Sequence, residues 1–257
     1  MPGRDGSQRA MTLPLASRIA LVTGASRGLG YATARALAKA GAHVVAVART
    51  QGGLEELDDE IRKASGEGAT LVPLDLTDLE AIARLGGALH ERHGKLDIFV
   101  GNAGIAGPSS PLGHIAPKPW GDVMAINLNA NFQLIRCMEP LLRVSDAGRA
   151  VMISCDEARR APAYRGPAAA SKAALETLTR VWAAENATTA LRVNLFDPGP
   201  VRTRLRATIM PGEDPETLPT AAEVAEALLP LCLPSCDDNG KLYDYASRTL
   251  RDFAAAV

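Results

Sequence analysis

Short apolar runs alternate with amphipathic segments along the chain, and this pattern predicts strands and helices in turn. The apolar runs lack the polar–apolar alternation of a half-exposed strand, which is typical of a parallel sheet covered on both faces. We predict strands at 19–23, 43–48, 70–74, 97–100, 150–154, 191–196 and 241–245.

Helical spacing of apolar residues fills the stretches between these strands. We predict helices at 29–40, 54–64, from Asp78 onward, 120–142 and 168–186. Strands alternating with helices require right-handed crossovers, so we predict an α/β fold with a doubly wound parallel sheet of about seven strands flanked by helices. No linker divides the pattern, and we expect a flexible leader at 1–17 and a single domain at 18–257.

One segment, 203–219, interrupts the alternation because it is polar and punctuated by prolines. It follows the predicted sixth strand and therefore leaves the carboxyl end of the sheet. Long insertions at that edge commonly cover substrates. We predict a substrate lid at 203–219.

Composition narrows the choice of partner. The 28 basic and 29 acidic residues give a net charge of −1, so nothing favours nucleic-acid binding. No apolar run approaches the ~20 residues that span a bilayer, and Arg18 interrupts the apolar start that a signal peptide needs. The four cysteines are too few for a disulfide scaffold, and their spacing indicates no metal site. We expect a cytoplasmic protein with a small-molecule substrate and no membrane partner.

A glycine-rich segment, Thr23–Gly30 (TGASRGLG), lies where the first predicted strand turns into the first helix. Glycine lets the backbone turn sharply and approach a pyrophosphate closely. The helix N-terminus then offers free N–H groups and the positive end of its dipole. The strand–turn–helix context therefore favours a dinucleotide site over the alternative of a tight structural turn.

From Ser17 onward the chain resembles the short-chain dehydrogenases/reductases. Besides the TGxxxGxG spacing, further motifs follow in the family's order, namely Asp75 after the third strand, Asn102-Ala103-Gly104 after the fourth, Asn127 in the long helix, and Pro198-Gly199 with Thr203 after the sixth. The resemblance implies a Rossmann fold, a nicotinamide cofactor and oxidoreduction of a carbonyl/alcohol pair. It also implies a homodimer or homotetramer formed through the 120–142 helix and the helix of Lys172.

The resemblance further implies which residues contact the cofactor. They are Gly24, Ser26, Arg27, Gly28, Leu29, Gly30, Arg49, Thr50, Asp75, Leu76, Asn102, Ala103, Gly104, Lys172, Pro198, Gly199, Val201 and Thr203.

Charge at the end of the second strand bears on which cofactor is used. A carboxylate there would bind a ribose 2′-OH and repel a 2′-phosphate. This chain has Ala48 followed by Arg49 and Thr50, and Arg27 stands inside the glycine loop. Guanidinium groups fork onto phosphate, so we predict NADP(H) in preference to NAD(H). The alternative is that both arginines are merely solvated.

The family's catalytic residues are a serine, a tyrosine, a lysine and the helix asparagine. The segment around Ser171-Lys172 matches the one that carries the family lysine, and Asn127 matches the asparagine. The tyrosine belongs four residues before the lysine, where this chain has Ala168. The serine belongs thirteen residues before the tyrosine position, where this chain has Cys155.

These two departures leave two interpretations open. In the first, the protein is an NADP(H)-dependent oxidoreductase with an altered site made of Lys172, Asn127, Cys155 and Tyr164. Tyr164 would be the substitute proton donor if its loop folds back, and we expect the Lys172 ammonium to lower the pKa of the Cys155 thiol. In the second, the protein is a pseudoenzyme that binds NADP(H) as a subunit or sensor without turnover.

Overall fold

The computed structural model describes residues 13–252 of the 257-residue chain. Most of the leader predicted at 1–17 lies outside the described residues. In the described part, Leu15 is fully buried and its amide donates to the Ala40 carbonyl at 2.9 Å. The packed domain therefore begins before Arg18, because an apolar side chain just ahead of it completes the core beside the first helix.

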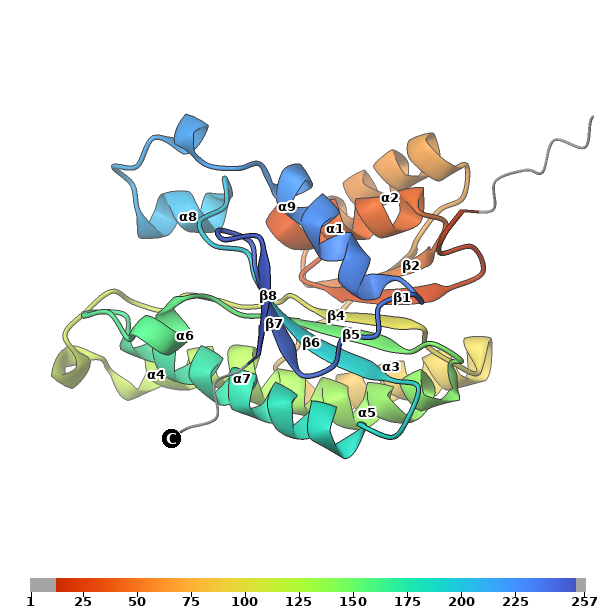
Figure 1. The fold of residues 1–257 in the computed structure, drawn as a ribbon. Coiled ribbons are helices and arrows are strands. Elements are labelled where there is room, and N and C mark those ends of the chain that lie inside the picture. The colour runs from red at the N-terminus through yellow and green to blue at the C-terminus, as the bar shows by residue number, and fades with distance from the viewer. Residues whose placement is uncertain (1–12, 253–257) are drawn as a thin grey trace, which may run out of the picture.

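Eight strands form one sheet in the order β3-β2-β1-β4-β5-β6-β7-β8 (Figure 1). They are β1 (Ile19–Thr23), β2 (His43–Ala48), β3 (Thr70–Pro73), β4 (Ile98–Gly101), β5 (Arg149–Ile153), β6 (Arg192–Asp197), β7 (Lys241–Asp244) and β8 (Thr249–Asp252). The first seven are parallel, which confirms the predicted doubly wound sheet. The eighth is an antiparallel edge strand that was not predicted, because all its residues are exposed and it has no apolar run.

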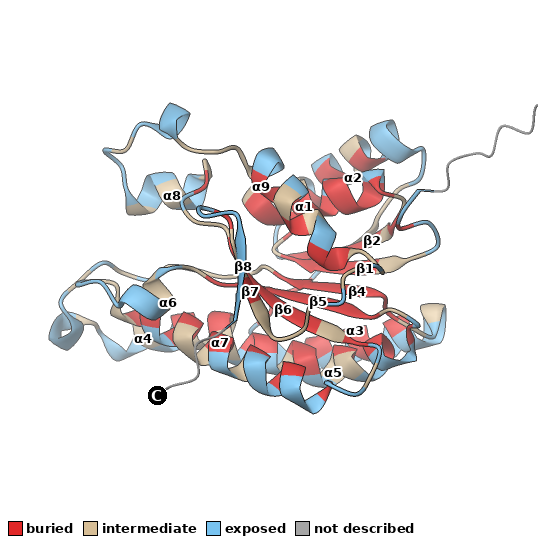
Figure 2. Cartoon of the chain, viewed as in Figure 1, coloured by how far each residue is buried: buried red, intermediate tan, exposed pale blue. Residues whose placement is uncertain are grey.

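Helices cover both faces of the sheet (Figure 1). One face carries α1 (Gly28–Lys39), α2 (Gln51–Ser65) and α9 (Ala221–Leu228). The other carries α3 (Leu79–His93), α5 (Ala130–Val144) and α7 (Gly166–Glu185), while α4 (Pro117–Met124), α6 (Glu157–Arg160) and α8 (Arg204–Ile209) lie towards one end. Buried residues follow the sheet and the inward faces of the main helices (Figure 2), whereas α8 has none.

The long helix predicted at 120–142 is interrupted. A π-helical segment, η2 (Ala125–Asn129), separates α4 from α5 and contains Asn127. Apolar spacing continues through it, so the pattern alone could not distinguish the wider turn from an α-helix. Single π turns recur at functional positions because they re-aim the side chains of a helix.

The strand order fixes where a ligand meets the sheet. Connections leave β1 towards β2 on one side and β4 towards β5 on the other, so the order reverses between β1 and β4. Ligands of such sheets bind outside the carboxyl ends of the strands at this switch point. The glycine loop, the segment after β4, the segment after β5 and the segment after β6 all emerge at this edge.

Candidate cofactor and catalytic site

The glycine loop between β1 and α1 is compact. Gly24 and Gly28 have φ angles of +66° and +59°, a region that side chains disfavour. A Cβ on Gly30 would lie 2.4 Å from the Gly24 carbonyl oxygen. The loop therefore leaves bare backbone where a pyrophosphate would approach, and a nicotinamide dinucleotide fits it.

Asn102, after β4, braces this loop from the neighbouring strand. Its Nδ2 donates to the Thr23 carbonyl at 2.8 Å. The Thr23 hydroxyl in turn accepts from the backbone amides of Asn102 and Ala103 at 3.0 and 3.1 Å. Asn102 and Ala103 thus hold the shape of the loop. The cofactor contact predicted for these two residues stays a prediction.

Two helix N-termini meet at the loop, those of α1 and α2. Neither Arg27 nor Thr50, the residues at the two N-caps, makes a side-chain cap, so the first N–H groups remain available. The α2 end packs tightly on the loop, because a Cβ on Gly53 would lie 2.7 Å from the Ser26 carbonyl oxygen. Arg27 and Arg49 are both exposed, and within the described residues neither forms an ion pair.

Asp75, after β3, lies within electrostatic reach of Arg49. Its pKa is lowered, first by the Thr77 backbone amide and hydroxyl that donate to it and then by the Arg49 charge. Asp75 is therefore an ionised acceptor near Arg49, and the cofactor contacts predicted for these two residues stay predictions.

Asn127 and Lys172 converge beside Gly104. The Asn127 side chain is fully buried; its Oδ1 accepts from the Ile105 amide at 2.8 Å, and its Nδ2 donates to the Ser171 hydroxyl at 3.0 Å. A Cβ on Gly104 would lie 3.2 Å from Asn127 Oδ1 and 3.5 Å from Lys172 Nζ. Only a small residue at 104 leaves room for both groups.

Lys172 is buried in α7, and its Nζ donates to the Ile153 carbonyl at the end of β5 at 2.6 Å. Burial lowers the pKa of Lys172, while the nearby carboxylates of Glu176 and Asp197 oppose this shift. The ammonium is consequently a stronger acid than that of an exposed lysine.

Lys172 lowers the pKa of the Cys155 thiol as expected, but the net shift of that pKa is upward. Burial raises the pKa of its thiol to about 11 and outweighs the opposing effect of Lys172. Its Sγ lies 3.9 Å from Glu157 Oε2 and is a weak donor to that carboxylate. Cys155 therefore stays a neutral thiol at neutral pH, because desolvation penalises the thiolate more than one ammonium favours it.

The structure does not bring Tyr164 together with the buried Lys172. Tyr164 is 61% exposed and lies on the loop between α6 and α7 with a φ of +68°. Ala168 is 4% exposed and precedes Lys172 by one helical turn, so a methyl group occupies that position on the helix.

The segment 203–219 leaves the sheet after β6 and carries α8. Thr203 lies against the glycine loop, because a Cβ on Gly28 would be 3.4 Å from its methyl group. The Arg206 guanidinium forks onto Glu213 at 2.5 and 2.6 Å and ties α8 to the chain that follows. The Arg202 amide donates to the Pro219 carbonyl at 2.9 Å and closes the base of the segment.

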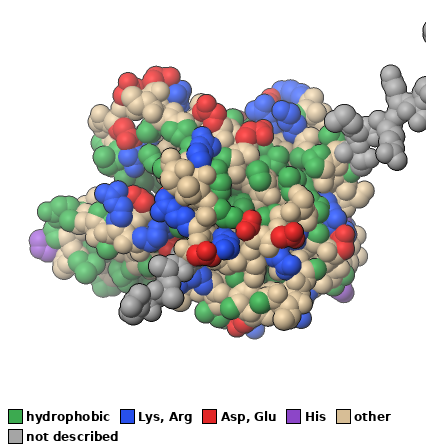
Figure 3. All heavy atoms as spheres, viewed as in Figure 1, with side chains coloured by type: hydrophobic (Ala, Val, Ile, Leu, Met, Phe, Trp, Pro, Cys, Tyr) green, Lys and Arg blue, Asp and Glu red, His purple; other side chains and the backbone are tan. Residues whose placement is uncertain are grey.

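Sequence reasoning missed a buried group of charges behind this site. Arg159 of α6 forms ion pairs with Glu176 of α7 and with Asp197 at the end of β6. One signal was available, since Glu176 follows Lys172 by four residues and therefore shares its helix face. Figure 3 shows basic side chains gathered over α6, beneath the 203–219 segment.

Two negative findings apply to residues 13–252. No group of three or more His, Cys, Asp or Glu side chains there is arranged to hold a metal ion. Among the helices of the same residues, none has the length and apolar character needed to cross a bilayer.

A glycine loop at the switch point of this sheet defines a dinucleotide-binding protein of the Rossmann class. Residues 18–214 match the sequence profile of the short chain dehydrogenases. The chain belongs to this family of oxidoreductases.

Individual relatives agree with this assignment. The chain is 38% identical over 212 residues to the uncharacterized oxidoreductase YciK of Escherichia coli K12, covering 82% of this chain and 84% of that protein. It is 35% identical over 227 residues to cis-4-hydroxycyclohexanecarboxylate dehydrogenase of Sinomonas cyclohexanicum, covering 83% and 88%.

Solved structures extend the likeness to three dimensions. A short chain dehydrogenase of Shigella flexneri in complex with NADP has a TM-score of 0.88 at 36% identity, covering 91% of this chain and 99% of that one. One from Escherichia coli CFT073 in complex with NADPH has a TM-score of 0.87 at 36% identity, covering 91% and 98%.

Proposed function

We propose that the protein is an NADP(H)-dependent oxidoreductase that interconverts a carbonyl and an alcohol in a small-molecule substrate. The observation that carries the proposal is the convergence of Lys172 and Asn127 beside Gly104, at the sheet edge where the glycine loop emerges. When bound, the cofactor supplies or accepts the hydride. Lys172 would hold a proton beside Asn127 and orient the ribose of the bound cofactor. Asn127 fixes the Ile105 amide and the Ser171 hydroxyl through its hydrogen bonds.

The cofactor preference is supported by charge. Arg27 and Arg49 flank two uncapped helix N-termini, and no carboxylate stands at the end of β2 to repel a 2′-phosphate. The two solved relatives described above bind NADP and NADPH. We further propose that residues 203–219 act as the substrate lid, since Thr203 already contacts the glycine loop.

The first prediction tests the cofactor. Direct titration should give a lower Kd for NADPH than for NADH. Arg49→Ala should raise the Kd for NADPH by roughly ten- to hundredfold and leave NADH nearly unchanged, because a charge-assisted contact to phosphate contributes about 1.5–3 kcal/mol. Arg62→Ala is the matched control, since Arg62 is an exposed arginine of α2, the helix that follows Arg49, and pairs with Asp58. Equal affinities of the unmutated protein for both cofactors would contradict the proposal.

A pseudoenzyme that binds NADP(H) without turnover is the second candidate. One observation favours it. Ala168 occupies the helix position one turn before Lys172, where the family has its tyrosine, and Tyr164 is exposed to solvent. Both candidates bind the cofactor, so only turnover separates them. A screen of carbonyls with NADPH and of alcohols with NADP⁺, followed by absorbance, decides between them.

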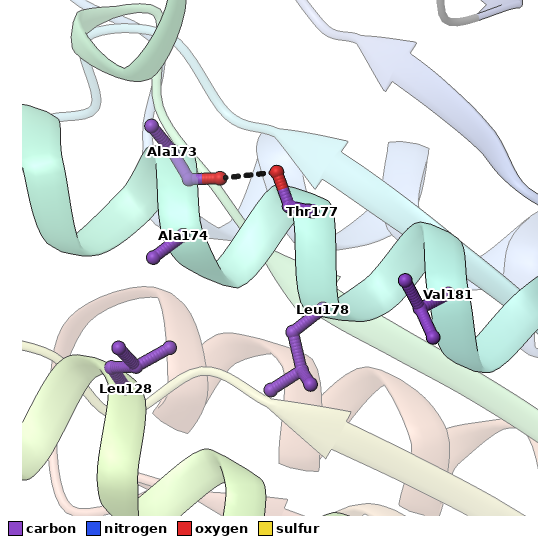
Figure 4. A pocket seen from close by; sticks show the side chains of 6 residues that line it. All are labelled: Leu128, Ala173, Ala174, Thr177, Leu178 and Val181. Carbon is purple, nitrogen blue, oxygen red and sulfur yellow. Dashed lines mark hydrogen bonds between the residues drawn. The ribbon is translucent and has the colours of Figure 1, made fainter.

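We also propose a homo-oligomer, a dimer or tetramer, in a cytoplasmic setting. Figure 4 shows an apolar hollow on the outer side of α7 and the π-helical segment. It is lined by Leu128, Ala173, Ala174, Thr177, Leu178 and Val181. The Thr177 hydroxyl donates to the Ala173 carbonyl at 3.1 Å, so the hydrogen bond of the polar member of this lining is made within α7.

The cytoplasmic setting is supported by the cysteines. All four cysteines are free, as is typical of a reducing compartment.

A further inference from the structure

Arg159 bridges two buried carboxylates. One of its terminal nitrogens donates to Glu176 Oε1 and the other to Asp197 Oδ2. Glu176 is 5% exposed and Asp197 is 2% exposed, whereas the Arg159 side chain is 32% exposed at the surface of α6. The guanidinium of one partly exposed arginine therefore compensates the negative charges of two buried carboxylates.

Glu176 connects Arg159 to the lysine helix. It lies one turn beyond Lys172 on α7 and accepts a second hydrogen bond, at 2.5 Å, from the Ser154 hydroxyl. Ser154 directly follows Ile153, whose carbonyl accepts from Lys172 Nζ. Glu176 and Lys172 are thus both fastened to the end of β5.

Asp197 connects Arg159 to the other side of the site. Its Oδ1 accepts from the Gly199 amide at 3.0 Å. Gly199 has a φ of +61° and begins the turn that leads to Thr203, which lies against the glycine loop. Asp197 therefore fixes the start of the 198–203 turn through its hydrogen bond to Gly199.

Removing one partner of a buried ion pair leaves an uncompensated charge, which proteins tolerate poorly. Burial raises the pKa of Asp197, and the Arg159 charge opposes that rise. The negative charges of Glu176 and Asp197 also raise the pKa of Lys172, against the effect of its burial. Without Arg159, an unbalanced pair of carboxylates would stand behind Lys172 and the 198–203 turn.

We propose that Arg159 is a positioning residue that couples the Lys172 helix to the 198–203 turn and so holds the two sides of the nicotinamide end of the site in register. The proposal rests on the proposed cofactor binding but not on turnover. Arg159 acts through Glu176 and Asp197, and it touches neither Lys172 nor the glycine loop.

The test compares two neighbouring arginines. Arg159→Met keeps the aliphatic length and removes the charge, and we expect it to raise the Kd for NADPH at pH 8 by at least tenfold. Arg160→Met is the matched control, because Arg160 belongs to the same short helix but is 75% exposed and, within residues 13–252, pairs with Asp156 alone, at 2.9 Å. We expect less than a twofold change for that variant.

A pH series distinguishes charge compensation from simple packing. Lowering the pH from 8 to 5.5 should restore NADPH affinity to Arg159→Met, because burial raises the pKa of Asp197 and protonating that carboxylate relieves the imbalance that the substitution creates. A loss of affinity that is the same at every pH would overturn the proposal, as would equal losses in the two variants. Arg159→Lys, which can pair with only one carboxylate at a time, should lie between the two if Arg159→Met does not fold.

A readout that needs no cofactor separates this proposal from the proposed function. Hydrogen exchange of the free protein should be faster at residues 198–203 in Arg159→Met than in Arg160→Met. If the unmutated protein does not bind NADPH, the proposed function fails while this comparison still decides the role of Arg159. Unchanged exchange in the segment would overturn the coupling.

Discussion

At the scale of single residues, two side chains decide what chemistry is open to the site. Ala168 presents a methyl group where the family resemblance implies a tyrosine, and Cys155 presents a thiol whose burial keeps it protonated. Lys172 is then the group beside Asn127 whose proton is held less tightly than usual, because burial lowers its pKa. A carbonyl reductase of this composition should work slowly for lack of a well-placed acid.

Restoring a tyrosine at 168 tests this directly. A hydroxyl there would stand one turn before Lys172 on the same helix face, and the ammonium would lower its pKa from ~10. Ala168→Tyr should raise kcat by about 10²-fold or more, the range of general acid catalysis, and change KM less. Adding Cys155→Ser should raise kcat further, since a hydroxyl donates a stronger hydrogen bond than a thiol.

The competing interpretation assigns proton transfer to Tyr164. In that case Tyr164→Phe would abolish the native activity, and Ala168→Tyr would bring no gain. Because Tyr164 is 61% exposed, we expect Tyr164→Phe to retain most of the activity. Steady-state kinetics of both variants on one substrate separates the two assignments.

At the scale of elements, apolar runs predicted the seven parallel strands because residues buried on both faces leave an unmistakable pattern. Short or exposed elements carry no such pattern, which is why β8, α6 and α8 were missed. The π-helical turn at Asn127 was missed because apolar spacing continues through it. The Arg159 ion pairs were out of reach for another reason, since Arg159 and Asp197 are 38 positions apart and only the sheet topology brings them together.

Contacts among β2, β3 and α3 make the free energy of unfolding depend on pH. His43 of β2 donates to or accepts from the Thr70 hydroxyl at 2.9 Å, and its ring lies 5.7 Å from that of His93 in α3. Burial lowers the pKa of both histidines below the ordinary 6.5, and the Arg92 charge adds to the shift. A depressed folded-state pKa means that the stabilisation is complete above pH 6.5 and is lost as the pH falls through the folded-state value.

We therefore expect the Tm to fall as the pH is lowered below about 6.5. His43→Gln should reduce this dependence, as measured by thermal unfolding at a series of pH values. His90→Gln is the control, because His90 is an exposed histidine of the same α3 helix. An identical pH dependence in both variants would show that the His43–His93 contact is not its source.

At the scale of the whole molecule, the apolar hollow on α7 predicts self-association. Val181 lines it and is 49% exposed, which is a large apolar side chain to leave in water. Val181→Glu should convert the oligomer to a monomer in light scattering at micromolar concentration, because association would bury an unpaired charge. Leu205→Glu is the control, since Leu205 is 50% exposed on α8 but lies outside the hollow. An unmutated protein that is monomeric in this measurement would contradict the oligomer.

The closed base of the 203–219 segment has a meaning for how such a protein can change over time. Arg202 and Thr220 form an isolated bridge, so the chain leaves and re-enters the domain at nearly one point. The residues between Thr203 and Thr220 can be lengthened, shortened or recombined without altering the register of a strand. The arginines proposed to choose the cofactor lie at the opposite end of the chain. Under the roles proposed above, substrate preference and cofactor preference are inherited through separate stretches of sequence, and the first can diversify while the second stays constant.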